Sequence, residues 1–323
     1  MSKILVTGGC GFIGSNFVKF VLNEIDNKET CNLFNFTSNY DIDMINVIDD
    51  LSSGFNGLKD VKHDKLHIIN KEFSNDQILS DVRNGIYKHV FHFAAKSRIG
   101  WCEENAEEAF EINVYKTIKL IEACKKGDTP FTFSSSSAVY GKSSNMLTTL
   151  LKEPISIYGI HKSMIEDYLK ISAHWKYTIL RYFNVYGPGD LGVGHKTAVS
   201  AWCQQIKNGE PITFDGNGDQ SRDMIFVEDV AKANLLTYFA KSDTYQKIIN
   251  VGSGESITNN MILRLMQKRL YKKGRLIQVQ ENPTRKNDIE NTKAKYSQSE
   301  SNRLFYSTPF ETGLELTMDW WKL

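Results

Sequence analysis

A tyrosine and a lysine four residues apart, Tyr158 and Lys162, are the pair in this sequence that points most directly to chemistry. They open a stretch with helical spacing of apolar residues that runs to Leu169. Residues i and i+4 lie on one face of an α-helix, so the phenol and the ammonium can point into one cleft. A tyrosine has an unperturbed pKa of about 10 and is a poor base at neutral pH. Because nearby positive charge favours the phenolate, we expect Lys162, together with a second positive charge on a bound cofactor, to bring the pKa of Tyr158 closer to neutrality.

A run of four serines, Ser134 to Ser137, follows a predicted strand at 131–133. In an open parallel sheet, side chains at the carboxyl end of a strand face the ligand crevice. We therefore expect Ser136 to hydrogen-bond the reacting oxygen beside Tyr158. Alone, the tyrosine and lysine would more often be a solvated helix face and the serines a turn, but all three elements together predict a catalytic site.

The glycine-rich stretch at 7–14, Thr-Gly-Gly-Cys-Gly-Phe-Ile-Gly, follows an apolar run at 3–7 and precedes an amphipathic helix expected over about 15–24. Glycine permits a tight turn and lets backbone N–H groups approach a pyrophosphate, to which the helix N-terminus adds partial positive charge. Because the glycines stand between a strand and a helix, they predict a dinucleotide-binding turn. The residues expected to contact the dinucleotide are Gly8, Gly11, Phe12, Ile13 and Gly14.

Two aspartates, Asp49 and Asp50, end a second predicted strand at 45–48. A carboxylate at this position accepts hydrogen bonds from the adenosine ribose and repels a 2′-phosphate, so the pair favours NAD over NADP. The interval from Gly14 to Asp49 exceeds the usual spacing of about 20 residues, which we attribute to an insertion around 25–44. Whichever aspartate does not bind the ribose is expected to lie in a solvated turn.

The overall composition excludes several classes of protein. The 39 Lys and Arg residues balance 38 Asp and Glu, for a net charge of +1, which gives no electrostatic case for nucleic acid or an anionic membrane as partner. No uninterrupted apolar run reaches about eighteen residues, so no transmembrane helix is expected. The strand signal from Lys3 leaves no room for a signal peptide, and five scattered cysteines without CxxC spacing favour reduced thiols and a cytoplasmic protein. His89 and His92 are expected to border a strand, and no metal site is expected.

Strand and helix signals alternate through the first half of the chain, with strands also predicted at 66–69 and 90–93 and a helix over 105–125. This alternation predicts an α/β fold, a Rossmann-type doubly wound parallel sheet covered on both faces. After residue 189, shorter mixed elements and turn signals indicate a smaller α/β lobe. We predict an NAD-binding domain over 1–180, with the insertion at 25–44, and mainly a substrate-binding lobe over 181–323 that is interleaved with it.

Taken together, these motifs resemble the extended short-chain dehydrogenase/reductase family, which holds nucleotide-sugar epimerases and dehydratases. The matching motifs cover nearly the whole chain: the glycine turn, His92-Phe93-Ala94-Ala95, Ser134–Gly141, Tyr158 with Lys162, Leu180–Pro188, Ser221-Arg222-Asp223 and Pro283-Thr284-Arg285. The resemblance implies NAD as cofactor, contacted also by Ala94, Ala95 and Lys162, and a catalytic set of Ser136, Tyr158 and Lys162. It also implies a homodimer through helices near 105–125 and 158–173, whose apolar faces could equally be intramolecular core.

For the substrate, the resemblance implies contacts with the diphosphate of a nucleotide sugar. Asn184 and Arg222 occupy the matching positions, with Arg285 as a third candidate, and guanidinium groups bind phosphate oxygens bidentately. Because Asp223 follows Arg222, a structural ion pair is the alternative for this arginine. Ser136 and Ser137 are expected beside the sugar.

The motif after the fifth strand separates the reactions of this family. In the 4,6-dehydratases it resembles Thr-Asp-Glu, whose two carboxyl groups eliminate water, whereas Ser136, Ser137 and Ala138 stand here and cannot usefully transfer that proton. The resemblance is therefore closest to the UDP-sugar 4-epimerases and implies epimerisation of a UDP-hexose at C4 through a transient 4-keto sugar. Tyr158 would take the C4 hydroxyl proton while hydride passes to NAD⁺, which stays bound.

Three alternatives stay open besides the dehydratase. Gly194-His195-Lys196 resembles the Gly-His-Lys stretch of ADP-heptose 6-epimerases, in which the lysine is a second acid/base, although a surface role for Lys196 fits equally well. Cys102, on a loop expected to face the substrate, is either an acid/base or a packed thiol. The third alternative is a protein that binds NAD without catalysing a reaction. The presence of Ser136, Tyr158 and Lys162 together argues against it.

Overall fold

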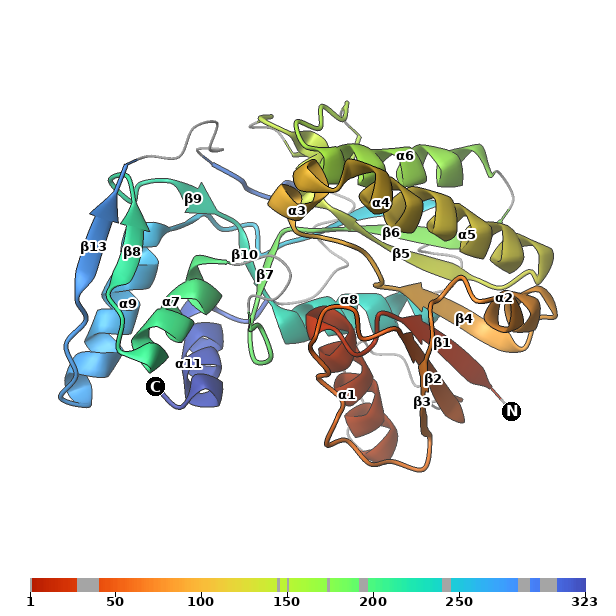
Figure 1. Cartoon of the computed structure of the whole chain (residues 1–323), viewed down its shortest axis with the longest axis horizontal. Coiled ribbons are helices and arrows are strands. Elements are labelled where there is room, and N and C mark those ends of the chain that lie inside the picture. The colour runs from red at the N-terminus through yellow and green to blue at the C-terminus, as the bar shows by residue number, and fades with distance from the viewer. Residues whose placement is uncertain are drawn as a thin grey trace.

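A computed structural model describes residues 2–27, 41–143, 146–149, 151–172, 175–191, 197–239, 245–283, 291–296 and 307–323. The described residues form two parts: a parallel sheet with helices on both faces, and a smaller lobe beyond the carboxyl ends of the sheet strands (Figure 1). Most of the insertion expected at 25–44 lies outside the described residues. Within the described part of the chain, no helix is both long and apolar enough to cross a membrane.

Seven parallel strands form the large sheet. They are β1 (Lys3–Thr7), β2 (Met44–Asp49), β3 (Leu66–Asn70), β4 (Tyr87–His92), β5 (Phe131–Ser136), β6 (Tyr177–Tyr182) and β11 (Lys247–Val251). Their order, β11-β6-β5-β4-β1-β2-β3, runs outward in both directions from β1 and β4. This is the doubly wound topology predicted from the sequence, and such sheets bind ligands at the carboxyl ends of the two strands from which the order diverges.

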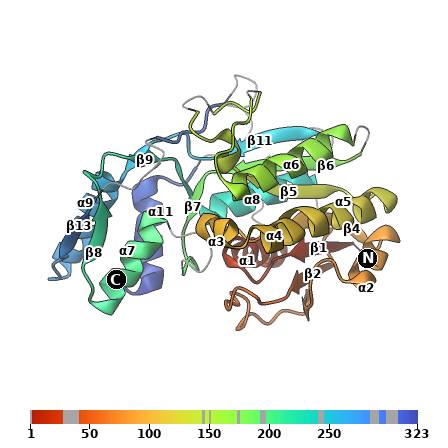
Figure 2. The same cartoon turned by 45° about the horizontal axis from the view of Figure 1, so that its top comes forward.

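Helices cover both faces of the sheet. They are α1 (Phe12–Asp26), α2 (Asp76–Arg83), α3 (Ile99–Glu104), α4 (Ala106–Phe110), α5 (Thr117–Lys126), α6 (Ile157–Ile171) and α8 (Val227–Phe239). Side chains along β1 point alternately to the two faces of the sheet and so belong to two hydrophobic cores. Leu5 packs with residues of α2, α5 and α6, whereas Ile4 and Val6 pack with residues of α1 and α8. Figure 2 shows α4, α5 and α6 together on one face.

The helix expected over 105–125 is a composite. After α4 the chain widens into a π-helical stretch, η1 (Glu111–Lys116), and then continues as α5. Asn113 lies in η1, and its side chain accepts the backbone N–H of Lys96 and donates to the carbonyl of Lys96. The helix predicted over 105–125 is therefore confirmed, with a π-helical turn at η1 that the sequence did not indicate, and such turns often occur at functional sites.

The smaller lobe has an apolar core of its own, which includes Trp202, Phe214, Met266 and Leu314. It is built from β7 (Asn184–Tyr186), β8 (Ile212–Asp215), β9 (Ser221–Arg222), β10 (Met224–Phe226), β12 (Ile257–Thr258), β13 (Val279–Asn282), α7 (Ala198–Asn208), α9 (Asn259–Lys272) and α11 (Phe310–Trp321). Although both come after residue 181, β11 is a strand of the large sheet and α8 packs beside α1 on one of its faces. The two parts are therefore interleaved along the chain. The boundary at residue 180 stays a prediction.

Candidate active site

The glycine turn joins β1 to α1 and requires glycine for steric reasons. Gly8 has φ of +68°, and a Cβ there would lie 2.5 Å from the backbone nitrogen of Ala94. A Cβ on Gly14 would lie 2.3 Å from the carbonyl oxygen of Gly8. The turn therefore packs directly on the segment after β4. Because α1 begins at Phe12 with no side chain capping its N-terminus, the first N–H groups of that helix can serve a phosphate.

Asp49 and Asp50 have different surroundings. The two carboxylate oxygens of Asp49 accept the N–H groups of Cys10 and Leu51, both at 2.9 Å. Asp50 is exposed and accepts the N–H of Ser52. Burial raises the pKa of Asp49, while the N–H donors of Leu51 and Cys10 act in the opposite direction. Asp49 is thus built into the glycine turn, whereas Asp50 only closes the turn that follows β2.

The expected catalytic residues come together at the carboxyl end of β5. Tyr158 and Lys162 lie one turn apart at the start of α6, and the Lys162 Nζ lies 5.7 Å from the centroid of the Tyr158 ring. The ammonium donates to the carbonyl oxygen of Ser134 at 2.7 Å. Tyr158 faces Ser136, the last residue of β5, and the two hydroxyl groups interact. The structure therefore places a phenol, a hydroxyl and an ammonium at one point of the sheet edge.

Burial dominates the ionisation of this pair in the chain without cofactor. Burial raises the pKa of Tyr158, and the hydrogen bond with Ser136 only partly opposes that rise. Burial also lowers the pKa of Lys162 from 10.5 to about 7, against the opposing charges of Cys102 and Glu166. Without a bound cofactor, Lys162 does not offset the effect of burial on Tyr158, because the ammonium shares the buried site and donates to a backbone carbonyl. A further positive charge in the crevice is needed to favour the phenolate.

Comparison with known proteins decides the family. Residues 4–252 match the model of the NAD dependent epimerase/dehydratase family. The chain belongs to this family. Over 85% of the chain and 84% of the relative, it is 32% identical to a Methanocaldococcus jannaschii protein provisionally assigned as a UDP-glucose 4-epimerase.

Solved structures agree in fold and in chemistry. The UDP-N-acetylglucosamine 4-epimerase of Methanobrevibacter ruminantium, in complex with UDP-N-acetylmuramic acid, matches with a TM-score of 0.84 and 31% identity, covering 99% of this chain and 98% of that one. The UDP-glucose 4-epimerase of Thermus thermophilus, in complex with NAD, matches with a TM-score of 0.81 and 26% identity over 99% of both chains. The expected fold, the NAD cofactor and the class of nucleotide-sugar epimerases are thereby confirmed.

Close packing between α6 and the serine segment depends on a glycine that sequence reasoning missed. Ser136 accepts the N–H of Ala138 and so begins a short 3₁₀ helix, η2 (Ser137–Tyr140), with Ser137 half-buried as its first residue. A Cβ on Gly159 would lie 2.7 Å from the carbonyl oxygen of Ala138. Only a glycine next to Tyr158 therefore lets α6 approach η2 this closely.

Lys96 and Asn113 are also missing from the sequence-based site. Lys96 follows Ala94 and Ala95 in the segment after β4, and its ammonium donates to Ser52 Oγ, after β2, at 3.1 Å. The Lys96 side chain therefore spans from the loop after β4 to the loop after β2, and Asn113 fixes its backbone. A cation directly after the Ala-Ala pair was a signal in the sequence, but the contact with Asn113 depends on the π-helical turn.

The substrate candidates lie in the smaller lobe. Asn184 begins β7, and its side chain donates to the carbonyl of Asp223 at 3.3 Å; Arg222 ends β9 and donates to the carbonyl of Ser221. The Asp223 carboxylate accepts the backbone N–H groups of Ser253, Gly254 and Ala294 and the hydroxyl of Ser253. Lys196 and Arg285 lie outside the described residues.

The histidines and Cys102 have structural surroundings. His92 is the last residue of β4, at its border as expected, whereas His89 lies inside the strand; burial lowers the pKa of each to about 3. His92 bonds Thr7 and Thr117, and the described residues hold no cluster of three metal-binding side chains. Cys102 is buried and donates to the carbonyl of Lys96, as a packed thiol does.

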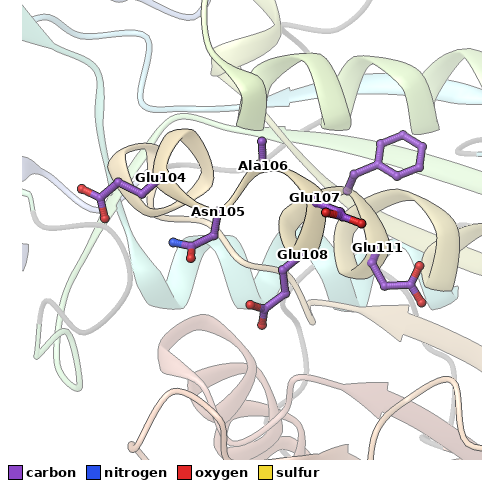
Figure 3. A pocket seen from close by; sticks show the side chains of 7 residues that line it. Glu104, Asn105, Ala106, Glu107, Glu108 and Glu111 are labelled. Carbon is purple, nitrogen blue, oxygen red and sulfur yellow. The ribbon is translucent and has the colours of Figure 1, made fainter.

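A surface hollow of about 780 Å³ lies along α3, α4 and η1. Figure 3 shows the side chains of Glu104, Glu107, Glu108 and Glu111 around it. Four carboxylates repel a diphosphate, so this hollow is the wrong place for a nucleotide sugar. The site is instead at the strand ends.

Proposed function

We propose that this enzyme interconverts UDP-hexoses that differ at C4, through a transient 4-keto sugar and with bound NAD. The observation that carries the proposal is the meeting of Ser136, Tyr158 and Lys162 at the end of β5, in the same sheet edge as the glycine turn. UDP as the nucleotide is supported by the relatives, which are named for UDP-sugars.

The residues around the glycine turn fit NAD. Its pyrophosphate would lie on the turn and on the uncapped start of α1, against Gly8, Gly11, Phe12, Ile13 and Gly14. Asp49 is our choice for the ribose, since each of its oxygens keeps a second lone pair beside the backbone bonds. Ala94, Ala95, Lys96 and Lys162 complete the cofactor side. NAD⁺ supplies the hydride acceptor and the positive charge that the buried phenol lacks.

The protein's own part in the reaction is to hold and move one proton. Tyr158 takes the proton of the C4 hydroxyl when the alcohol becomes a ketone and returns it when the ketone is reduced. Ser136 holds the reacting oxygen next to the phenol. Lys162 donates to the Ser134 carbonyl and keeps a positive charge within one helical turn of Tyr158. The proton leaves and returns at one atom, so the cycle needs no second acid.

The same geometry disfavours dehydration. Elimination of water needs an acid and a base besides the tyrosine, and Ser137 and Ala138 occupy the positions after Ser136. The 6-epimerase alternative depends on Lys196, which lies outside the described residues. For the diphosphate we propose Asn184 and Arg222, with Arg285 as a further candidate. Ser137 would lie beside the sugar, and Lys196 stays a further candidate for contact with the substrate.

We also propose that two copies pair through α4, η1 and α6. These elements expose large apolar side chains on the outer face of the protein, and such contiguous residues are typical of a subunit interface. They are Phe110, Tyr115, Ile160, Met164 and Ile171. Light scattering should give a dimer that Met164→Glu dissociates, whereas Leu276→Glu, at an exposed position of the smaller lobe, should leave it intact. A monomeric wild-type protein would contradict this arrangement.

A panel of substrates tests the reaction. The enzyme is incubated with UDP-glucose, UDP-N-acetylglucosamine, UDP-glucuronate and dTDP-glucose, and the products are followed by NMR. We expect a new axial or equatorial isomer at C4 from at least one UDP-sugar. A keto product that absorbs in alkali would instead support dehydration.

A further inference from the structure

A buried ion pair lies beneath the catalytic helix. Glu166 on α6 and Arg181 on β6 are both fully buried. The arginine donates from Nε to Oε1 at 2.9 Å and from Nη2 to Oε2 at 2.6 Å, and Ser135 Oγ donates to Oε1 at 2.6 Å. None of these three side chains has a part in the proton transfer described above.

The pair is in register with the catalytic residues on both elements. Glu166 follows Lys162 by one helical turn and Tyr158 by two, on the same face of α6. Ser135 and Arg181 are opposite each other in the β5–β6 register. Ser135 stands between Ser134, whose carbonyl holds Lys162, and Ser136, which contacts Tyr158. One carboxylate therefore fastens α6 to the strand segment that the catalytic side chains use.

The arginine also reaches the serine segment by a second route. Its guanidinium lies 4.7 Å from the centroid of the Tyr140 ring, and Tyr140 ends η2, the turn that Ser136 begins. The Tyr140 hydroxyl donates to Asn250 at 2.7 Å, and Asn250 is opposite Arg181 in the β6–β11 register. Arg181 thus contacts both the helix that carries Tyr158 and the turn that carries Ser136.

Stability is a poor explanation for this pair. Removing two charges from water costs about as much as their attraction returns, and apolar replacements of similar size are often neutral or stabilising. A slip of one residue along a helix moves a side chain by about 1.5 Å and rotates it by about 100°. A misplacement of about 1 Å can cost about 100-fold in rate.

We propose that Glu166 and Arg181 are positioning residues that set the register of α6 on β5 and β6, and with it the contact between Tyr158 and Ser136. Only the kinetic measurements that test this proposal depend on the proposed function. The proposal predicts that loss of the pair affects the chemical step and the ionisation of Tyr158, and leaves substrate and cofactor binding in place.

The test replaces both charges at once, as Glu166→Leu with Arg181→Met, so that the net charge of the site is unchanged. The NAD-bound double variant should keep KM within about threefold and lose at least about tenfold in kcat. Tyr158 should ionise at higher pH, because the Ser136 hydrogen bond that lowers its pKa is weakened while Lys162 and Cys102 remain. That ionisation is read from the near-ultraviolet phenolate absorbance, after subtraction of the same titration with Tyr158→Phe.

A matched control removes a surface arginine–carboxylate pair of the smaller lobe, Arg269→Met with Asp319→Leu, and should behave as wild type. If the Glu166→Leu/Arg181→Met variant does not fold, Arg181→Lys is the alternative. It keeps the positive charge but loses the two parallel hydrogen bonds of the guanidinium to Glu166. It should change kcat and the titration of Tyr158 in the same directions. Wild-type kcat and an unchanged titration in a folded variant would overturn the proposal. The titration needs no substrate, so a failure of the UDP-sugar assignment would leave this test intact.

Discussion

The two parts of the molecule hold their candidate residues in different ways. In the large sheet, Tyr158, Lys162 and Asp49 lie at strand ends or in the first turn of a helix, and hydrogen bonds fix the latter two to the backbone. In the smaller lobe, Arg222 ends a strand of two residues, β9, which pairs with the two residues of β12 and forms one bridge with Asn291. We propose that the sheet holds the catalytic groups in fixed positions, while the lobe supplies the contacts with the substrate.

The first prediction tests the glycine turn of the large sheet and has the largest expected effect. Gly8→Ala should weaken NAD binding by about 100-fold or more, because the new Cβ would displace the segment at Ala94 and strain the backbone at φ +68°. Gly54→Ala is the matched control, since Gly54 has φ +71° but open space around it. Calorimetric titration with NAD measures both. Equal affinities in the two variants would contradict the steric account.

The second prediction tests the substrate contact proposed for the smaller lobe. Arg222→Leu should raise KM for the sugar nucleotide by about 10- to 100-fold, because it removes charge-assisted hydrogen bonds to phosphate, and should leave kcat within about threefold. Steady-state kinetics separate the two constants. Arg264→Leu, at an exposed arginine of α9, is the control and should change neither. An unchanged KM in Arg222→Leu would remove this arginine from the substrate site.

The third prediction separates the two aspartates. Asp49→Asn should weaken NAD binding by about tenfold and relax the discrimination against NADP, since the carboxylate both accepts turn N–H groups and repels a 2′-phosphate. Asp50→Asn should have little effect because Asp50 is exposed outside the turn. Fluorescence titrations with both dinucleotides give the comparison. The opposite order of effects would exchange the roles of these residues.

Elements that depend on local pattern were predictable from the sequence, and contacts between distant segments were not. The glycine turn and the five strands follow from glycine spacing and apolar periodicity, and the structure has all of them. Asn113 lies in a π-helical turn that no periodicity distinguishes from α-helix. Gly159 matters only because η2 packs against it. The raised pKa of Tyr158 depends on burial, which the Tyr-Lys spacing does not report.

A separate prediction concerns stability and pH. The pKa of Lys162 is about 7 in the fold, because burial disfavours the ammonium, and about 10.4 in an unfolded chain. Between these values the unfolded state binds a proton that the folded state lacks, so the free energy of unfolding rises with pH. For protein stripped of cofactor, that energy relative to Lys162→Met should be flat below pH about 7 and rise toward pH about 10. Denaturant titrations at several pH values would detect the slope, and a flat difference throughout would contradict the burial of the ammonium.

The central claim is that the phenol of Tyr158 moves the substrate proton, and Tyr158→Phe tests it most directly. The variant keeps the ring and loses only the hydroxyl, so NAD and UDP-sugar should bind as in wild type. NMR of the reaction mixture should then show no C4 epimer where the wild-type enzyme reaches equilibrium. Near-normal epimerisation by Tyr158→Phe would contradict the account.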